Sequence, residues 1–137
     1  MEELYNDSGY FRISYFPEKN MLLVHGYKSM TELDEVHYFN ELKKYGEAVV
    51  KYQPKFILFD TRDAYYPVSA ELDAVIEREL TPIVMKAGVK KIAFVLPTDI
   101  VSQIAVEHLV MNLDIDHEQI QRQFFDSREK AEQWLLE

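Results

Sequence analysis

The chain has 137 residues, 47% hydrophobic and 28% charged, and its 24 acidic and 15 basic side chains give a formal net charge of −9. This balance argues against nucleic acid and anionic membranes as partners, because both are bound through clusters of lysine and arginine. Cysteine is absent, which excludes disulfides, thiolate nucleophiles and cysteine-ligated zinc. The length fits one domain over residues 1–137.

The sequence shows no membrane or export signal. No apolar run approaches the roughly 18–20 residues of a membrane span. The first ten residues, MEELYNDSGY, lack both the basic region and the apolar core of a signal peptide. We therefore expect a cytoplasmic protein without membrane insertion, and we expect the polar residues 1–10 to be frayed.

Two short runs near the N-terminus predict a β-hairpin. Phe11–Phe16 alternates apolar and polar residues, which is typical of a half-buried strand, and Met21–Tyr27 forms a second apolar run. The four residues between the two runs, PEKN, suit a turn.

A long helix is predicted to start at Ser29 or Thr31 and to end near Tyr52. Each candidate cap is followed three residues later by an acidic residue, as in a capping box. Gly46 is unusual inside a helix: it either allows a close approach to the sheet or is a tolerated glycine that costs about 1 kcal/mol. The buried face is predicted from apolar residues at spacings of three and four: Val36, Phe39, Leu42, Tyr45 or Gly46, and Val49.

The middle of the chain predicts a buried strand followed by a second helix. Lys55–Phe59 is nearly all apolar, which is typical of a central strand covered on both faces. Ser69 is the predicted N-cap of the helix. We expect Pro82 to kink this helix or split it near Leu80, and Gly88 to end it.

The last third of the chain predicts two more strands and two more helices. Ile92–Leu96 is a buried strand, a helix follows over about residues 98–113, Gln121–Phe125 is a weaker edge strand, and a final helix opens near Asp126. The order β-β-α-β-α-β-α-β-α predicts an α/β fold: a mixed, mostly parallel sheet of about five strands covered by about four helices. Because ligands in such folds sit beyond the carboxyl ends of the strands, we expect the site within residues 60–69 and 97–99.

Three stretches carry a family resemblance: FILFDTRD at residues 56–63, KAGVKKIAFVLP at residues 86–97 and FFDSREKAEQWL at residues 124–135. With the N-terminal hairpin they resemble the STAS domain of sulfate transporters and anti-sigma-factor antagonists. The resemblance is closer to the stand-alone SpoIIAA-like proteins, grouped as STAS/SEC14-like, which occur in many bacteria. It implies a SpoIIAA/STAS-like fold.

The resemblance also implies a regulatory site at the start of the second helix. In the anti-sigma-factor antagonists, a kinase phosphorylates a serine there, within an Asp-Ser-Ser-Gly run. The corresponding segment here is PVSA at residues 67–70, which lacks the aspartate and the glycine and leaves Ser69 as a candidate phosphorylation site. The alternative is that Ser69 acts only as a helix cap.

The candidate binding surface follows the strand that ends at residue 59. Arg62 could bind an anion with its forked guanidinium. The alternative is a network in which Asp60 caps loop amides and Arg62 pairs with Asp60 or Asp63. Paired tyrosines on a loop are typical of contact surfaces, although we expect one of the two to pack inward. The candidate residues are Asp60, Thr61, Arg62, Asp63, Tyr65, Tyr66 and Ser69.

No motif assigns a catalytic residue, a cofactor or a metal. The four histidines are scattered, and glycine-rich phosphate loops and nucleophile motifs are absent. His37 and Glu41, four residues apart, could hold a metal, but an exposed hydrogen bond is the ordinary interpretation. His108 lies on an apolar stripe, where a hydrogen-bonded, half-buried side chain is expected.

These observations leave three hypotheses for the function. The first is a non-catalytic binding or regulatory module that contacts a protein partner through residues 60–69. The second is a carrier of a small apolar ligand or lipid, as the SEC14 resemblance implies. The third is a small enzyme that uses Asp60 or Asp63 as an acid or base. A homodimer is a further prediction, because Phe11–Phe16 and Gln121–Phe125 are both candidates for open sheet edges.

Overall fold

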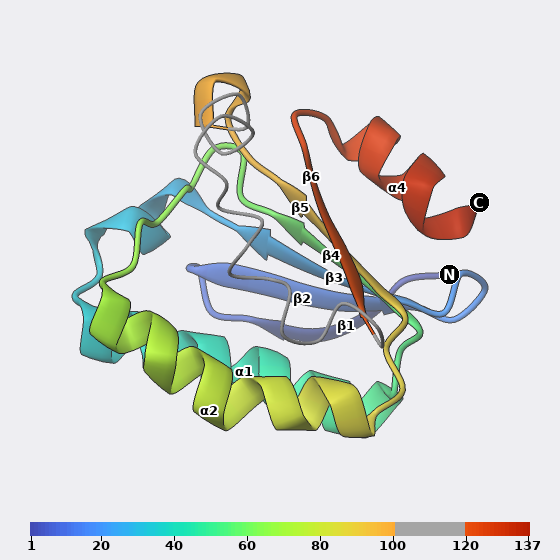
Figure 1. The fold of residues 1–137 in the computed structure, drawn as a ribbon, viewed down its shortest axis with the longest axis horizontal. Coiled ribbons are helices and arrows are strands. Elements are labelled where there is room, and N and C mark those ends of the chain that lie inside the picture. The colour runs from blue at the N-terminus through green and yellow to red at the C-terminus, as the bar shows by residue number, and fades with distance from the viewer. Residues whose placement is uncertain (101–119) are drawn as a thin grey trace.

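The computed structural model describes residues 1–100 and 120–137. In this part of the chain, six strands form one sheet whose spatial order follows the chain, β1-β2-β3-β4-β5-β6 (Figure 1). The first three strands pair antiparallel, and β3 to β6 pair parallel. The strands are β1 (Glu3–Asp7), β2 (Phe11–Phe16), β3 (Met21–Gly26), β4 (Phe56–Asp60), β5 (Lys91–Val95) and β6 (Gln121–Phe125).

The helices of the described residues lie on both faces of this sheet (Figure 1). They are the 3-10 helix η1 (Lys28–Glu32) and the α-helices α1 (Glu35–Tyr52), α2 (Ala70–Lys86) and α4 (Arg128–Leu136). Helices α1 and α2 pack against each other below the sheet, and α4 covers β4, β5 and β6 on the other face. The predicted α/β fold with a mixed sheet is confirmed, with six strands instead of five.

The extra strand is β1, which lies within the residues that we expected to be frayed. It pairs with β2 from Glu3↔Tyr15 to Asp7↔Arg12, with an irregularity between Leu4 and Asn6. Expectations of a frayed end and of an open β2 edge are therefore wrong. The physical reason is tertiary: Tyr5 packs edge-to-face on Tyr52, with ring centroids 6.0 Å apart.

The first long helix starts later than expected. Asp34 is the N-cap of α1, and its side chain accepts a hydrogen bond of 2.9 Å from the His37 amide. Both predicted caps are wrong, because their hydroxyls donate to carbonyls instead. Ser29 Oγ donates to the Gly9 carbonyl (2.6 Å), and Thr31 Oγ1 donates to the Lys28 carbonyl (2.7 Å).

Helix α2 begins at its predicted cap, and Ser69 Oγ accepts from the Leu72 amide (3.1 Å). The expected split near Leu80 is wrong, because α2 continues through Pro82. Pro82 is on the exposed side of the helix, where water can bind the carbonyl that proline leaves without a partner. Gly88 ends the helix as predicted, with a left-handed φ of +84° and an amide that donates to the Met85 carbonyl.

The predicted C-terminal elements are found within one or two residues. Strand β6 is at one edge of the sheet, opposite β1, and α4 is capped by Ser127 rather than Asp126. Residues 98–100 are helical, and the rest of the helix predicted over residues 98–113, with His108, lies outside the described residues. No helix that the described residues form is long and apolar enough to cross a membrane.

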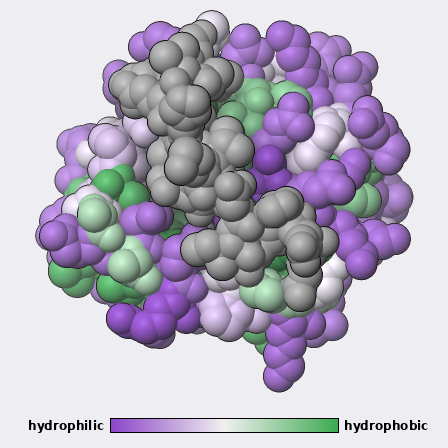
Figure 2. All heavy atoms as spheres, viewed as in Figure 1, coloured by the Kyte–Doolittle hydropathy of each residue, from purple (hydrophilic) through white to green (hydrophobic). Residues whose placement is uncertain are grey.

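The alternation of side chains along the strands creates a core on each face of the sheet. Leu22, Val24 and Ile57 face α1 and α2, whereas Leu23 and Leu58 face α4. On the face that Figure 2 shows, the described surface is mostly hydrophilic, with smaller hydrophobic areas between. The two buried faces explain the continuous apolar runs of β3, β4 and β5.

Gly46 brings the helices of one face together. A Cβ atom at this position would lie 3.0 Å from Leu80 Cδ2 and 3.6 Å from Ile83 Cδ1, both on α2. The close approach that we considered for Gly46 is therefore an approach to α2, not to the sheet.

Candidate functional site

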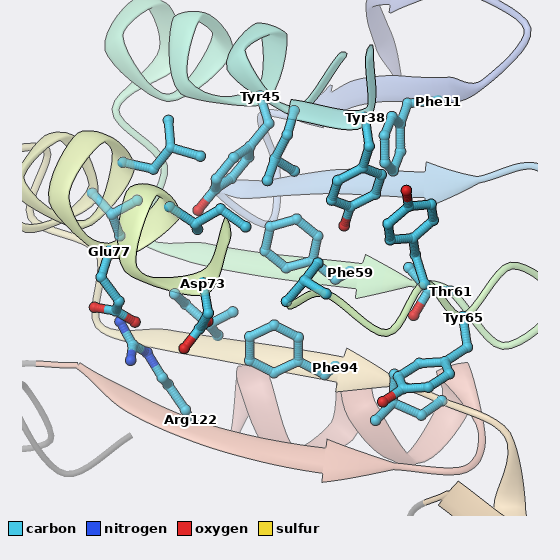
Figure 3. A pocket seen from close by; sticks show the side chains of 18 of the residues that line it. Phe11, Tyr38, Tyr45, Phe59, Thr61, Tyr65, Asp73, Glu77, Phe94 and Arg122 are labelled. Atoms are coloured by element: carbon cyan, nitrogen blue, oxygen red, sulfur yellow. The ribbon is translucent and has the colours of Figure 1, made fainter. Parts of the chain in front are cut away.

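A cavity of about 290 Å³ lies between α1, α2 and the sheet (Figure 3). Its volume is near the lower end of the range for small-molecule sites, roughly 300–1,000 Å³. Aromatic residues from six segments form much of its wall: Phe11, Tyr38, Tyr45, Phe59, Tyr65, Tyr66, Phe94 and Phe124.

Three of these aromatic rings form one row across the sheet, and Figure 3 labels two of them, Phe59 and Phe94. Phe59, Phe94 and Phe124 occupy paired positions on β4, β5 and β6. The centroids of Phe59 and Phe94 are 5.4 Å apart, those of Phe94 and Phe124 are 5.2 Å apart, and both pairs are stacked. All three side chains are only half-buried among their neighbours. The row therefore lines one wall of the cavity with aromatic carbon.

The predicted loop forms one end of the cavity. Thr61, Tyr65, Tyr66 and Val68 all line it. The Tyr66 hydroxyl donates to the Leu33 carbonyl (2.6 Å), and both tyrosines are half-buried, so the expectation that only one of them packs inward is wrong. Residues that the sequence suggested as an outer contact patch thus contribute to the wall of a cavity.

Two tyrosines of α1 stand in the same wall. The ring of Tyr38 stacks on that of Tyr66 at 4.1 Å, and burial raises the pKa of the Tyr38 hydroxyl to about 12. Burial also raises the pKa of Tyr45, while the positive charge of Arg122 acts in the opposite direction. Both hydroxyls therefore stay protonated near neutral pH and can donate a hydrogen bond to a ligand.

Charged side chains line the opposite end of the cavity from Tyr65 (Figure 3). Asp73 and Glu77 come from α2, and Arg122 comes from β6. Glu77 Oε2 accepts a hydrogen bond from Thr81 Oγ1 (3.0 Å). The Nε atom of Arg122 is buried and has no hydrogen-bond partner among the described residues. The cavity thus combines an apolar wall with one charged end.

Asp60 lies apart from this cavity. Alternation along β4 places its side chain on the α4 face, where Asp60 Oδ2 is 3.6 Å from His25 Nδ1. Asp60 Oδ1 accepts from the Arg62 amide at 3.4 Å. Arg62 and Asp63 are exposed, and the ion pairs of the described residues do not join Arg62 to Asp60 or Asp63. The candidate residues 60–69 are therefore divided between two faces of the sheet.

Ser69 is bound to α1 by Glu35. The Ser69 amide donates to Glu35 Oε2 (2.8 Å), and the Ser69 hydroxyl donates to Glu35 Oε1 (2.7 Å). A phosphate on this hydroxyl would meet the negative charge of Glu35 instead of a cationic partner. Phosphorylation of Ser69 stays a prediction.

The candidate metal pair is not assembled. His37 Nδ1 is 2.8 Å from Asp34 Oδ1, while Glu41 accepts from Ser8 Oγ (2.6 Å) and Lys44 Nζ (3.0 Å). Within residues 1–100 and 120–137, no group of three or more metal-ligating side chains comes together.

Sequence reasoning missed most of the cavity wall. A signal was present: each of the runs FILFD, KIAFV and QRQFF carries phenylalanine at its fourth position. Parallel neighbours in register place such residues side by side. Arg122 gave no comparable signal, because a single arginine on an edge strand is ordinarily solvated.

No protein-family model, curated protein or solved structure matches the chain significantly. Membership of the SpoIIAA-like group therefore stays a prediction.

Proposed function

We propose that this chain is a non-catalytic binding module that takes a small, planar, largely apolar molecule into the cavity between α2 and the sheet. The single observation that carries this proposal is the row of half-buried rings of Phe59, Phe94 and Phe124 on the cavity wall. An aromatic ligand gains from the apolar area that it buries against these rings and from offset or edge-to-face contacts with them.

The same proposal places the chain within the SpoIIAA-like, STAS/SEC14-like proteins and in the cytoplasm. Support for the family comes from the shared order of a hairpin followed by alternating helices and strands. Support for the cytoplasm comes from the acidic, cysteine-free composition.

Contact with a protein partner through residues 60–69, and a homodimer, stay predictions. The partner surface has less support than the cavity, because Tyr65 and Tyr66 line the cavity and the Tyr66 hydroxyl is bound to the Leu33 carbonyl. Arg62 and Asp63 are the exposed charges of that segment. An enzyme using Asp60 also has less support, because this carboxylate lies away from the cavity.

Calorimetric titration with 2-naphthamide, a neutral planar probe, tests the proposed function. A ligand efficiency of about 0.3 kcal/mol per heavy atom gives such a probe a Kd on the order of 1 mM or below. Ile76 lines the cavity from α2, and the adjacent Val75 does not. We expect Ile76→Trp to fill the cavity and weaken binding about tenfold or more, and Val75→Trp to keep the wild-type Kd. Absence of saturable binding, or equal losses in the two variants, would contradict the proposal.

A further inference from the structure

We infer that the ligand of this cavity carries a small anionic group, such as a carboxylate, and that the guanidinium of Arg122 binds it. The inference rests on the proposed function and adds the chemical class of the ligand: a planar apolar body with a carboxylate at one end. Three observations on the charged end of the cavity support it.

The first observation is that Arg122 lacks a partner for its charge among the described residues. Its side chain lines the cavity, and its Nε atom is buried without a hydrogen-bond acceptor. The ion pairs of the described residues do not include Arg122. A buried N–H group without an acceptor costs free energy, which an anionic ligand would recover through a charge-assisted hydrogen bond.

The second observation concerns the two carboxylates at the same end of the cavity (Figure 3). Asp73 is exposed in the first turn of α2, where the helix N-terminus and water stabilise its charge. Glu77 accepts from Thr81. Both acids thus have stabilising partners of their own and form no ion pair with Arg122. Their negative charge weakens the attraction of Arg122 for an anionic ligand, but neither carboxylate takes the place of that ligand.

The third observation is the arrangement of donors around the cavity. Tyr45 is buried, and both Tyr45 and Arg122 line the cavity (Figure 3). A guanidinium only donates hydrogen bonds, and a protonated phenol can donate one to an acceptor oxygen nearby. Carboxylate oxygens match this donor set, and the fork of arginine suits their planar geometry.

Three probes that share the naphthalene ring and differ in charge test the inference. They are 2-naphthoate, 2-naphthamide and 2-naphthylmethylammonium, each titrated calorimetrically into the wild-type chain. We expect 2-naphthoate to bind about tenfold more tightly than 2-naphthamide, and the ammonium probe to bind most weakly.

Single substitutions test whether Arg122 causes the tighter binding of 2-naphthoate. Arg122→Gln should make the Kd values of 2-naphthoate and 2-naphthamide equal, and Arg122→Lys should restore part of the difference. Glu77→Gln should tighten 2-naphthoate binding severalfold, because it removes a like charge from the same end. Arg128→Gln on α4, on the other face of the sheet, is the matched control and should leave the ratio unchanged.

The outcomes separate the inference from the proposed function. Equal binding of the three probes, or tightest binding of the ammonium probe, overturns the anionic ligand while a binding cavity remains. A loss in Arg122→Gln that is the same for all probes also overturns it, because Arg122 then only supports the fold. Absence of binding by every probe contradicts the proposed function, and the inference fails with it.

Discussion

Ser69 shows how one hydroxyl serves two helices. Its oxygen accepts from the Leu72 amide at the start of α2, and its O–H group donates to Glu35 of α1. The side chain therefore caps one helix and joins it to another. A phosphate on Ser69 would have to displace the Glu35 carboxylate from the hydroxyl. The repulsion between Glu35 and a negative charge at position 69 is therefore the effect to test.

We predict that Ser69→Asp is less stable than Ser69→Ala, although aspartate is itself a good N-cap. Ser69→Ala should lose about 1–2 kcal/mol in the free energy of unfolding, since it removes the cap. Ser69→Asp should lose more unfolding free energy, because its carboxylate is repelled by that of Glu35. Adding Glu35→Gln to Ser69→Asp should recover the difference. Urea unfolding measures all three variants.

Ser127→Asp is the matched control for this series, because Ser127 caps α4 by accepting from the Lys130 amide and does not contact Glu35. It should stay near the wild-type stability. If Ser69→Asp is as stable as the wild type, the segment accommodates negative charge and the phosphorylation hypothesis gains support.

The buried tyrosines predict a loss of stability in alkaline solution. Burial raises the pKa of Tyr38 from 10.0 to about 12, so the folded chain holds this proton more tightly than the unfolded chain. The stabilisation is fully present below pH 10 and is lost as the pH rises towards 12. Compared with Tyr38→Phe, the wild type should lose up to about 1.4 kcal/mol of unfolding free energy per pH unit in this window. If the unfolding free energies of the wild type and Tyr38→Phe differ by a constant amount from about pH 9 to about pH 11, this prediction is contradicted.

At the scale of elements, tertiary contacts explain where local patterns failed. The segment ELYND is polar and was expected to be frayed, yet it forms β1 because Tyr5 packs on Tyr52 and because β2 offers an edge for pairing. Ser29 is a good local cap, but its hydroxyl is used by the Gly9 carbonyl, twenty residues away along the chain. The central strands were predictable, because a strand that is buried on both faces has a continuous run of apolar residues.

Hydrogen exchange tests whether β1 belongs to the sheet. We expect amides within Glu3–Asp7 that bond to β2 to exchange roughly tenfold or more slowly than those of an unstructured peptide. Mass spectrometry of a peptide covering these residues measures the rate. Exchange at the unstructured rate would mean that the N-terminus is frayed after all.

Gly46 sets the distance between α1 and α2, so a larger side chain should separate them. Gly46→Leu is expected to lose about 1–3 kcal/mol in unfolding free energy, because the added atoms meet Leu80. Lys43→Leu, at an exposed position of the same helix, is the control and should change stability by less than about 0.5 kcal/mol. A neutral Gly46→Leu would show that the two helices move apart without cost.

At the scale of the whole molecule, the site joins segments that lie far apart in the sequence. The expected location beyond the carboxyl ends of the strands was partly useful, because Thr61, Tyr65 and Tyr66 belong to the cavity wall. The sequence could not show that Phe59 and Phe124 meet in one row, since that depends on the strand order. Nor could it show that Asp60 faces away.

The measurement that tests the central claim most directly is an isotope-filtered NOE experiment on the labelled chain with bound 2-naphthoate. We predict NOEs from the probe to the ring protons of Phe59, Phe94 and Tyr45, which only a molecule inside the cavity can reach together. NOEs confined to Val36 and Phe39, in the shallow groove between the starts of α1 and α2, would contradict the account and place binding there instead.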